Sequence, residues 1–144
     1  MDTEPPSCVY DAAIVMAKFI QHNFDVKDKT IVELGAGCGF TACHLGKLQS
    51  ASQSKSKVIA TDLDSVVPLI QRNIEKNQVQ SKVTAMPLFW GNKDHLEQVK
   101  TAAGASVDLI FGADILFDFD NFDGLFDIFD QLSKVFVPKN EEQK

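Results

Sequence analysis

Three glycines at alternate positions follow a short apolar run in the stretch VELGAGCGF, residues 32–40. Gly35 and Gly37 would let the backbone approach a nucleotide closely, although a tight strand-to-helix turn without a ligand also uses such glycines. A dinucleotide motif has glycine at its sixth position, but this chain has Phe40 there. Glu33 stands where dinucleotide sites have an apolar residue, and a carboxylate repels a pyrophosphate. The stretch therefore favours a positively charged cofactor without phosphate.

S-adenosylmethionine meets these requirements, because it combines a sulfonium, an ammonium and an adenosine. Gly35 and Gly37 would lie against its amino-acid part, and Glu33 would offer negative charge near its cationic end. Asp62 ends a second apolar run, VIATD, close to the spacing expected of a carboxylate that binds ribose hydroxyls. The alternative role of helix N-cap is better filled by the polar residues at 64 and 65.

Two further candidate residues follow later apolar runs. Trp90, the single tryptophan, comes after KVTAMPL, where its indole would stack on adenine or serve as a core aromatic. Asp114 lies in GADILF, residues 112–117, directly after VDLIF. Ligands of parallel sheets bind at the carboxyl ends of the strands, where the strand order reverses. The glycine loop and GADILF are therefore expected to line one crevice.

Alternating strand and helix patterns must position these residues. Apolar strand runs are predicted at residues 29–34, 58–62, 82–88 and 107–111, and helices at 11–23, 41–48, 65–77, 94–100 and 122–136. This alternation predicts an α/β, Rossmann-like, mostly parallel sheet with helices on both faces. Pro87 places its strand at an edge, because proline donates no backbone hydrogen bond. The last helix is expected to bury one face, formed by Phe122, Leu125, Phe126, Phe129, Leu132 and Phe136.

The composition argues against several functional classes. The 144 residues suffice for one domain, and the net charge of −6 argues against a nucleic-acid partner. No run approaches the ~20 apolar residues of a membrane span, so no membrane association is expected. Cys8, Cys38 and Cys43 lack a disulfide framework spacing, which favours reduced thiols in the cytosol or nucleus. No metal is expected, since the histidines are scattered and FDFDNFDGLFDIFD fails the EF-hand spacing.

Taken in order, these motifs resemble the seven-β-strand (class I) S-adenosylmethionine-dependent methyltransferases, and within them methyltransferase family 16, which are mainly protein-lysine methyltransferases. The likeness covers residues 9–134 and rests on VYDAAIVMAKFI, VELGAGCG, ATDLDSVVPLIQRNIEKN, LFWGN and DLIFGADILF. It implies S-adenosylmethionine as the cofactor. The contacts that it implies, besides the Glu33 expected above, are Tyr10, Gly35, Ala36, Gly37, Asp62, Trp90, Ala113 and Phe117.

The resemblance implies methyl transfer to the ε-amine of a lysine in a protein substrate. Asp114 would orient the incoming amine, and its alternative role is a loop carboxylate that accepts hydrogen bonds from backbone amides. Phe117 stands where the family usually has tyrosine, so the aromatic wall is kept and the hydroxyl is lost. Two other functions stay open: a non-catalytic cofactor-binding or interaction module, and a small-molecule methyltransferase.

The family sheet has seven strands, whereas four are expected here. Residues 1–144 are therefore interpreted as the N-terminal part of the family domain, truncated after the fourth strand and its following helix. VDLIF would then lie at an open edge. It is apolar and has neither proline nor lysine, so self-association through this edge is expected.

Overall fold

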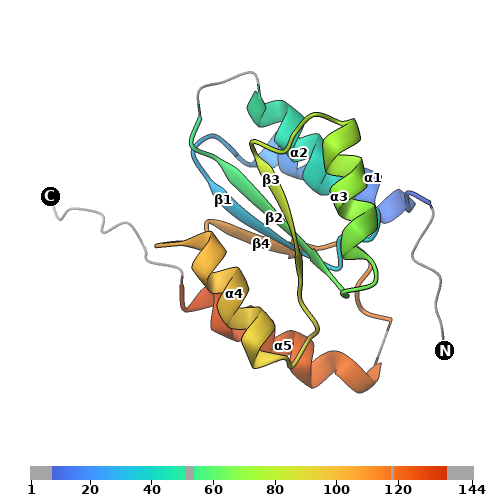
Figure 1. Ribbon diagram of the computed structural model, residues 1–144, viewed down its shortest axis with the longest axis vertical. Helices are drawn as coiled ribbons and strands as arrows, with labels where there is room; N and C mark the ends of the chain where they lie inside the picture. Colours follow the sequence, from blue (N-terminus) through green and yellow to red (C-terminus); the bar gives the residue numbers. More distant parts are fainter. Residues whose placement is uncertain (1–7, 51–53, 118, 136–144) are drawn as a thin grey trace, which may run out of the picture.

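Four parallel strands form one sheet between two layers of helices (Figure 1). The computed structural model describes residues 8–50, 54–117 and 119–135. The elements are α1 (Asp11–Asn23), β1 (Thr30–Leu34), α2 (Phe40–Ser50), β2 (Lys57–Asp62), α3 (Val67–Lys76), β3 (Val83–Pro87), α4 (Lys93–Ala103), β4 (Leu109–Gly112), the 3₁₀ helix η1 (Phe119–Asn121) and α5 (Phe122–Ser133). The predicted α/β, Rossmann-like architecture is confirmed.

The strand order is β3-β2-β1-β4, with every pair parallel. Leu34 lies opposite both Thr61 and Gly112, and Asp62 lies opposite Pro87. The carboxyl ends of all four strands therefore meet at one edge of the sheet. Pro87 is on an edge strand, as its missing backbone donor predicts.

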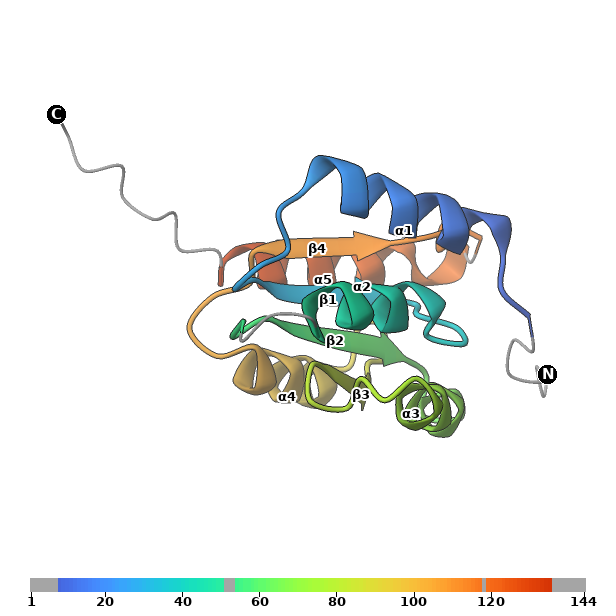
Figure 2. The same cartoon turned by 90° about the horizontal axis from the view of Figure 1, so that it is seen from above.

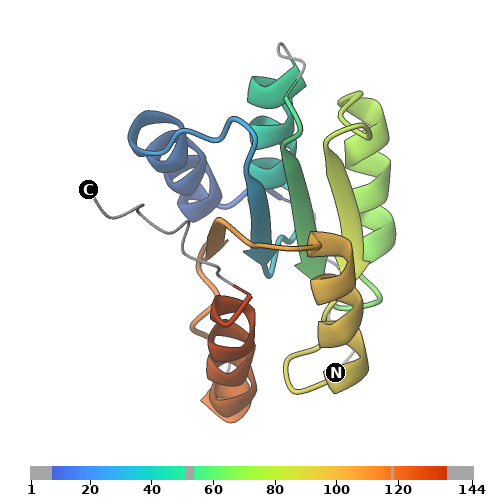
Figure 3. The ribbon, with the colours of Figure 1, turned by 90° about the vertical axis from the view of Figure 1, so that its left-hand side faces the viewer.

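The two faces of the sheet are covered by different helices (Figures 2 and 3). Helices α1, α2 and α3 cover one face, and α4 and α5 cover the other. Because side chains alternate along a strand, Ile31 packs with the first group and Val32 and Leu34 pack with the second. Glu33, between Val32 and Leu34, therefore faces the side of α2.

The buried face of α5 differs from the predicted one. Phe126 was expected inside but is 61% exposed, and Ile128 was not expected inside but is buried. A helix with apolar residues around much of its circumference supports two overlapping stripes, and the packing against the sheet decides between them. Phe136 lies outside the described residues. The fully buried side chains of α5 are Leu125, Ile128 and Leu132.

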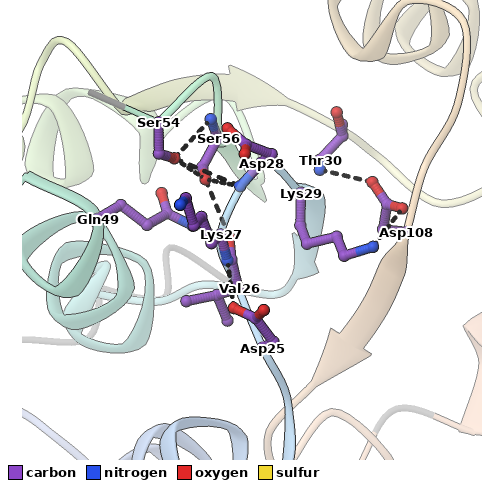
Figure 4. A network of polar contacts seen from close by, with 10 residues as sticks. All are labelled: Asp25, Val26, Lys27, Asp28, Lys29, Thr30, Gln49, Ser54, Ser56 and Asp108. Carbon is purple, nitrogen blue, oxygen red and sulfur yellow. Dashed lines mark hydrogen bonds and ion pairs between the residues drawn. The ribbon is translucent and has the colours of Figure 1, made fainter. Parts of the chain in front are cut away.

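A polar network joins the amino ends of the strands, opposite the carboxyl edge (Figure 4). The Asp108 carboxylate accepts hydrogen bonds from Thr30 N at 2.9 Å and Lys29 Nζ at 3.4 Å. The Asp28 amide donates to Ser56 Oγ at 2.6 Å. These bonds tie the start of β1 to the segments that enter β4 and β2. The carboxyl edge is left for loops that can bind a ligand.

Candidate cofactor site

The loops that follow the four strands meet at the carboxyl edge. A Cβ atom placed on Gly35, after β1, would lie 2.7 Å from Ile115 Cγ2 and 3.9 Å from Trp90 Cζ2. The Gly37 amide donates a hydrogen bond to Asp62 Oδ2 at 2.7 Å. The strand order reverses between β1 and β4, which is where ligands bind in such sheets. The predicted glycine, aspartate and tryptophan positions are thus brought together.

The glycine loop is tight and uses conformations that other residues rarely adopt. Gly35, Gly37 and Gly39 have φ angles of +64°, +56° and +77°, which a Cβ atom disfavours. The Ala36 amide donates to Thr61 O at 2.9 Å, which ties the loop to the end of β2. A Cβ atom on Gly39 would lie 2.9 Å from the Ile70 side chain of α3. The last glycine therefore permits helix packing, and the first two shape the loop at the carboxyl edge of the sheet.

Each oxygen of the part-buried Asp62 carboxylate accepts one backbone hydrogen bond and can accept another. Oδ2 accepts from Gly37 N and Oδ1 accepts from Leu63 N, each at 2.7 Å. Burial raises the pKa of Asp62 above its ordinary value, and the two amides partly offset this effect. A carboxylate has about four lone-pair positions, so two remain for hydroxyl donors. The expectation that residue 64 or 65 caps the next helix is wrong, because Val66 is the N-cap of α3 and makes no side-chain cap bond.

Glu33 is buried beneath the start of α2. Its side chain is on the α2 side of β1, is only 2% exposed, and accepts a hydrogen bond from the Ala42 amide at 3.1 Å. Burial is the main cause that raises the pKa of Glu33 to about 8, and the charge of Asp62 adds to the shift. Glu33 is therefore mostly protonated at neutral pH. This differs from the expectation of a negative charge beside the cofactor, and the alternation of side chains along β1 explains the difference.

Trp90 lies in a tight turn between β3 and α4. The Asn92 amide donates to Phe89 O at 2.9 Å across this turn, and Gly91 has a φ angle of +93°, as the third residue of a type II turn requires. Trp90 is half-buried and packs against the α4–α5 core, while its indole also approaches Gly35. The indole therefore belongs in part to the core and in part borders the glycine loop, and its stacking on adenine stays a prediction.

Asp114 lies in the loop after β4, and the next residue, Ile115, anchors this loop to the sheet. Ile115 is 7% exposed and fills the space that Cβ atoms on Gly35 and Gly112 would occupy. Asp114 itself is exposed and has a φ angle of +56°. Among the described residues, no hydrogen bond to its carboxylate is present, which does not support the alternative role of bonding loop amides. The sequence patterns did not identify Ile115 as an anchor. The glycines at 35 and 112 could have indicated it, because they leave space for a bulky neighbour.

The remaining predicted contact residues differ in their exposure. Ala113 is half-buried, whereas Tyr10 and Phe117 are largely exposed. The pKa of Tyr10 is raised mainly by Cys8 and to a smaller degree by the charge of Asp114. Contact of these three residues with the cofactor stays a prediction.

The side-chain charges of the loops at the carboxyl edge favour a cationic ligand. Residues 35–39, 62–66, 88–92 and 112–117 contain no lysine or arginine and contain Asp62, Asp64 and Asp114. Pyrophosphate sites need positively charged donors that compensate negative charge, and these loops supply no cationic side chain. A ligand with hydroxyl groups, an ammonium and a sulfonium fits this set of carboxylates and positive-φ glycines.

The described part of the chain shows neither a membrane-spanning helix nor a cluster of metal ligands. No helix there is long and apolar enough to cross a membrane. Within the same residues, no group of three or more His, Cys, Asp or Glu side chains is arranged to hold a metal ion.

The sequence is similar to curated lysine methyltransferases. It is 36% identical over 93 residues to protein-lysine N-methyltransferase EFM6 of Saccharomyces cerevisiae, which covers 62% of this chain and 38% of that protein. It is 30% identical to protein N-lysine methyltransferase METTL21A of Danio rerio, over 87% of this chain and 54% of that protein. The chain thus spans about half the length, or less, of these relatives.

Solved methyltransferases share the fold. The O-methyltransferase of Bacillus cereus in complex with SAH superposes with a TM-score of 0.64 at 18% identity, covering 94% of this chain and 56% of that chain. TomG of Streptomyces achromogenes, an O-methyltransferase in complex with SAM, gives 0.65 at 14% identity, covering 95% and 56%. The model of methyltransferase family 16, described as lysine methyltransferase, matches residues 4–137. The resemblance noted from the motifs is confirmed: this chain belongs to the lysine methyltransferase family.

Proposed function

We propose that this chain forms the cofactor-binding part of an S-adenosylmethionine-dependent protein-lysine methyltransferase. The family match and the names of the curated relatives support the reaction class. The observation that supports it most within the structure is that the glycine loop bonds Asp62 through Gly37 and packs at Gly35 against Ile115, the neighbour of Asp114. Loops from β1, β2, β3 and β4 each contribute one part of the site.

S-adenosylmethionine supplies a methyl group on a sulfonium, and the chain's residues would hold both reactants in line. The free lone pairs of Asp62 would accept the ribose hydroxyls, and the Trp90 indole would contact adenine beside Gly35. The amino-acid part would lie along the glycine loop. Each of these contacts binds or orients, and none requires a covalent step with the protein.

Asp114 would orient the lysine amine. A lysine amine has a free pKa of about 10.4 and must lose a proton before it can attack. Desolvation in the crevice lowers that pKa, whereas a nearby carboxylate raises it. Asp114 is exposed, so it suits the positioning of the amine better than strong base catalysis.

Two measurements test this function. Calorimetry with S-adenosylmethionine and with S-adenosylhomocysteine measures cofactor binding, and no binding would overturn the proposal. Incubation of the protein, tritium-methyl cofactor and cell extract then reports transfer. Label that disappears from the precipitate after protease supports a protein substrate. Label in small molecules favours a small-molecule methyltransferase, and binding without any label favours a non-catalytic module.

We propose in addition that the open edge of β4 pairs with a second copy of the chain. In the described part of the molecule, β4 pairs only with β1, so its outer backbone groups are available. An apolar groove of about 550 Å³ runs beside this edge and is lined by residues that include Leu109, Ile110, Phe24 and Phe129. Light scattering over a range of concentrations should show a monomer–dimer equilibrium, with slower amide exchange in residues 109–112 of the dimer. A monomer at every concentration would contradict this.

We also propose a cytosolic or nuclear location. The support is chemical: Cys8, Cys38 and Cys43 are all free thiols, a state that a reducing compartment maintains. Cell fractionation of the tagged protein should recover it with cytosolic or nuclear markers, and recovery in a secretory fraction would refute the location.

A further inference from the structure

Helix α5 lies directly on the backbone of the turn that carries Trp90. Gly124 is in the first turn of α5, and a Cβ atom placed on it would lie 2.9 Å from Trp90 C, 3.0 Å from Trp90 O and 3.1 Å from Gly91 N. These separations are shorter than ordinary van der Waals contact, and all three atoms belong to one peptide group. A peptide group cannot rotate away as the end of a flexible side chain can. The close approach therefore exists only because residue 124 has no side chain.

The turn is held from its other sides as well. Leu88 N donates to Asp62 O at 2.8 Å, and Asn92 N donates to Phe89 O at 2.9 Å. The Asn92 side chain accepts from the first amides of α4, Asp94 N at 3.0 Å and His95 N at 3.1 Å. The connection from β3 to α4 is thus tied to β2 at its start and to α4 at its end (Figure 1). Helix α5 supports the peptide between these two ties.

Helix α5 cannot easily retreat from the turn. Leu125, the next residue, is fully buried against the sheet, as are Ile128 and Leu132. Moving the helix outward would uncover this apolar stripe. A side chain at position 124 would therefore displace the Trp90–Gly91 peptide rather than the helix. A displacement of a few tenths of an ångström at the peptide would be passed to the indole.

We propose that Gly124 is a positioning residue for Trp90. Its missing side chain lets α5 seat the Trp90–Gly91 peptide so that the indole borders Gly35, the place where the proposed function puts adenine. This inference rests on the proposed function only for the identity of the ligand. The placement of the indole itself depends on the contacts within the chain.

The test uses Gly124→Ala and the fluorescence of Trp90, which is the only tryptophan in the chain. Without cofactor, we expect the variant to show a shifted emission maximum and altered quenching by acrylamide. Calorimetry should show a dissociation constant for S-adenosylmethionine raised about ten-fold, as loss of a well-placed base–aromatic contact implies. Helix content should be retained, because alanine favours helix more than glycine does.

Matched variants separate positioning from general damage. Asp127→Ala, on the exposed face of α5, also raises helix propensity and should leave emission and cofactor affinity unchanged. Gly46→Ala places its Cβ atom 2.5 Å from Val83 Cγ2, so it should lower the melting temperature without shifting Trp90 emission. In a Trp90→Ala background, Gly124→Ala should cost less than two-fold in affinity, because its effect acts through the indole.

A folded Gly124→Ala protein with wild-type emission, quenching and affinity would overturn the proposal. If this variant does not fold, Gly91→Ala strains the same peptide from within the turn and leaves α5 intact. Wild-type emission in the Gly91→Ala variant would also overturn the proposal, because the proposal requires that a shift of the Trp90–Gly91 peptide move the indole. If the wild-type chain binds no S-adenosylmethionine, the proposed function fails, and the emission and quenching data still decide the role of Gly124.

Discussion

Glu33 provides a sharp test of the electrostatics beneath the glycine loop, because two effects of opposite sign act on it. The Ala42 amide at the start of α2 donates to its carboxyl group, and a helix N-terminus favours a negative charge. Burial disfavours the charge. The balance raises the pKa of Glu33 from 4.5 to about 8, so burial dominates. Replacement by glutamine, which keeps a carbonyl acceptor for Ala42 and cannot ionise, should remove the pH dependence that Glu33 causes.

The size of the effect follows from proton linkage. The folded protein holds the Glu33 proton up to about pH 8, whereas the unfolded chain releases it near the ordinary value of 4.5. Between these values the native state binds more protons, so the stability contributed by Glu33 is fully present below about pH 4.5 and is lost as the pH rises to 8. Each pH unit within this window costs ~1.4 kcal/mol. From pH 5.5 to 8.5 the wild type should lose about 3 kcal/mol relative to Glu33→Gln.

Urea unfolding at pH 5.5, 7 and 8.5, followed by circular dichroism, measures this difference. The control is Glu75→Gln on the exposed face of α3, which should stay within about 0.5 kcal/mol of wild type at each pH. Parallel pH profiles for wild type and Glu33→Gln would refute the reasoning. A wild type that gains stability over the variant as the pH rises would also refute it, because the carboxyl group would then be an ionised helix cap.

Three further predictions test the site and the core. Asp62→Asn should raise the dissociation constant of S-adenosylmethionine about ten-fold or more in calorimetry, since hydrogen bonds to a charged acceptor are lost, whereas Asp64→Asn should match wild type. Asp114→Asn should leave cofactor affinity within about two-fold and slow methyl transfer about ten-fold or more in a single-turnover assay; unchanged transfer would remove the orienting role. Leu125→Ala should cost about 2–5 kcal/mol of unfolding free energy, but Phe126→Ala less than about 1 kcal/mol, and the reverse order would contradict the observed face of α5.

Much of the architecture was predictable from local patterns. Alternating strand and helix patterns predicted the parallel sheet, and Pro87 predicted one of its edges. The approximate spacing of Asp62 and Asp114 from the glycine loop was enough to place both at the carboxyl edge, because strand ends in such a sheet align. The helix at 11–23 agrees with the structure at both ends.

Other features depended on contacts between distant parts of the chain. The charge pattern made Glu33 a candidate partner for a cation, but the sidedness of β1 buried it against α2. The phenylalanine spacing favoured one face of α5, and packing against the sheet selected another. Neither Ile115 nor Gly124 stands out in its local sequence, because an isoleucine after a strand and a glycine in a helix are ordinary.

The sequence by itself determined which elements form, their order and the residue types offered at the crevice, since periodicity and motif spacing are properties of neighbouring residues. Only the tertiary structure decided which way those residues face and how closely the elements approach. Glu33 is protonated because a helix closes over it, and Trp90 borders the glycine loop because α5 rests on its peptide at Gly124. The burial of a side chain and the distance between two packed elements depend on segments far apart in the chain, so no local pattern encodes them.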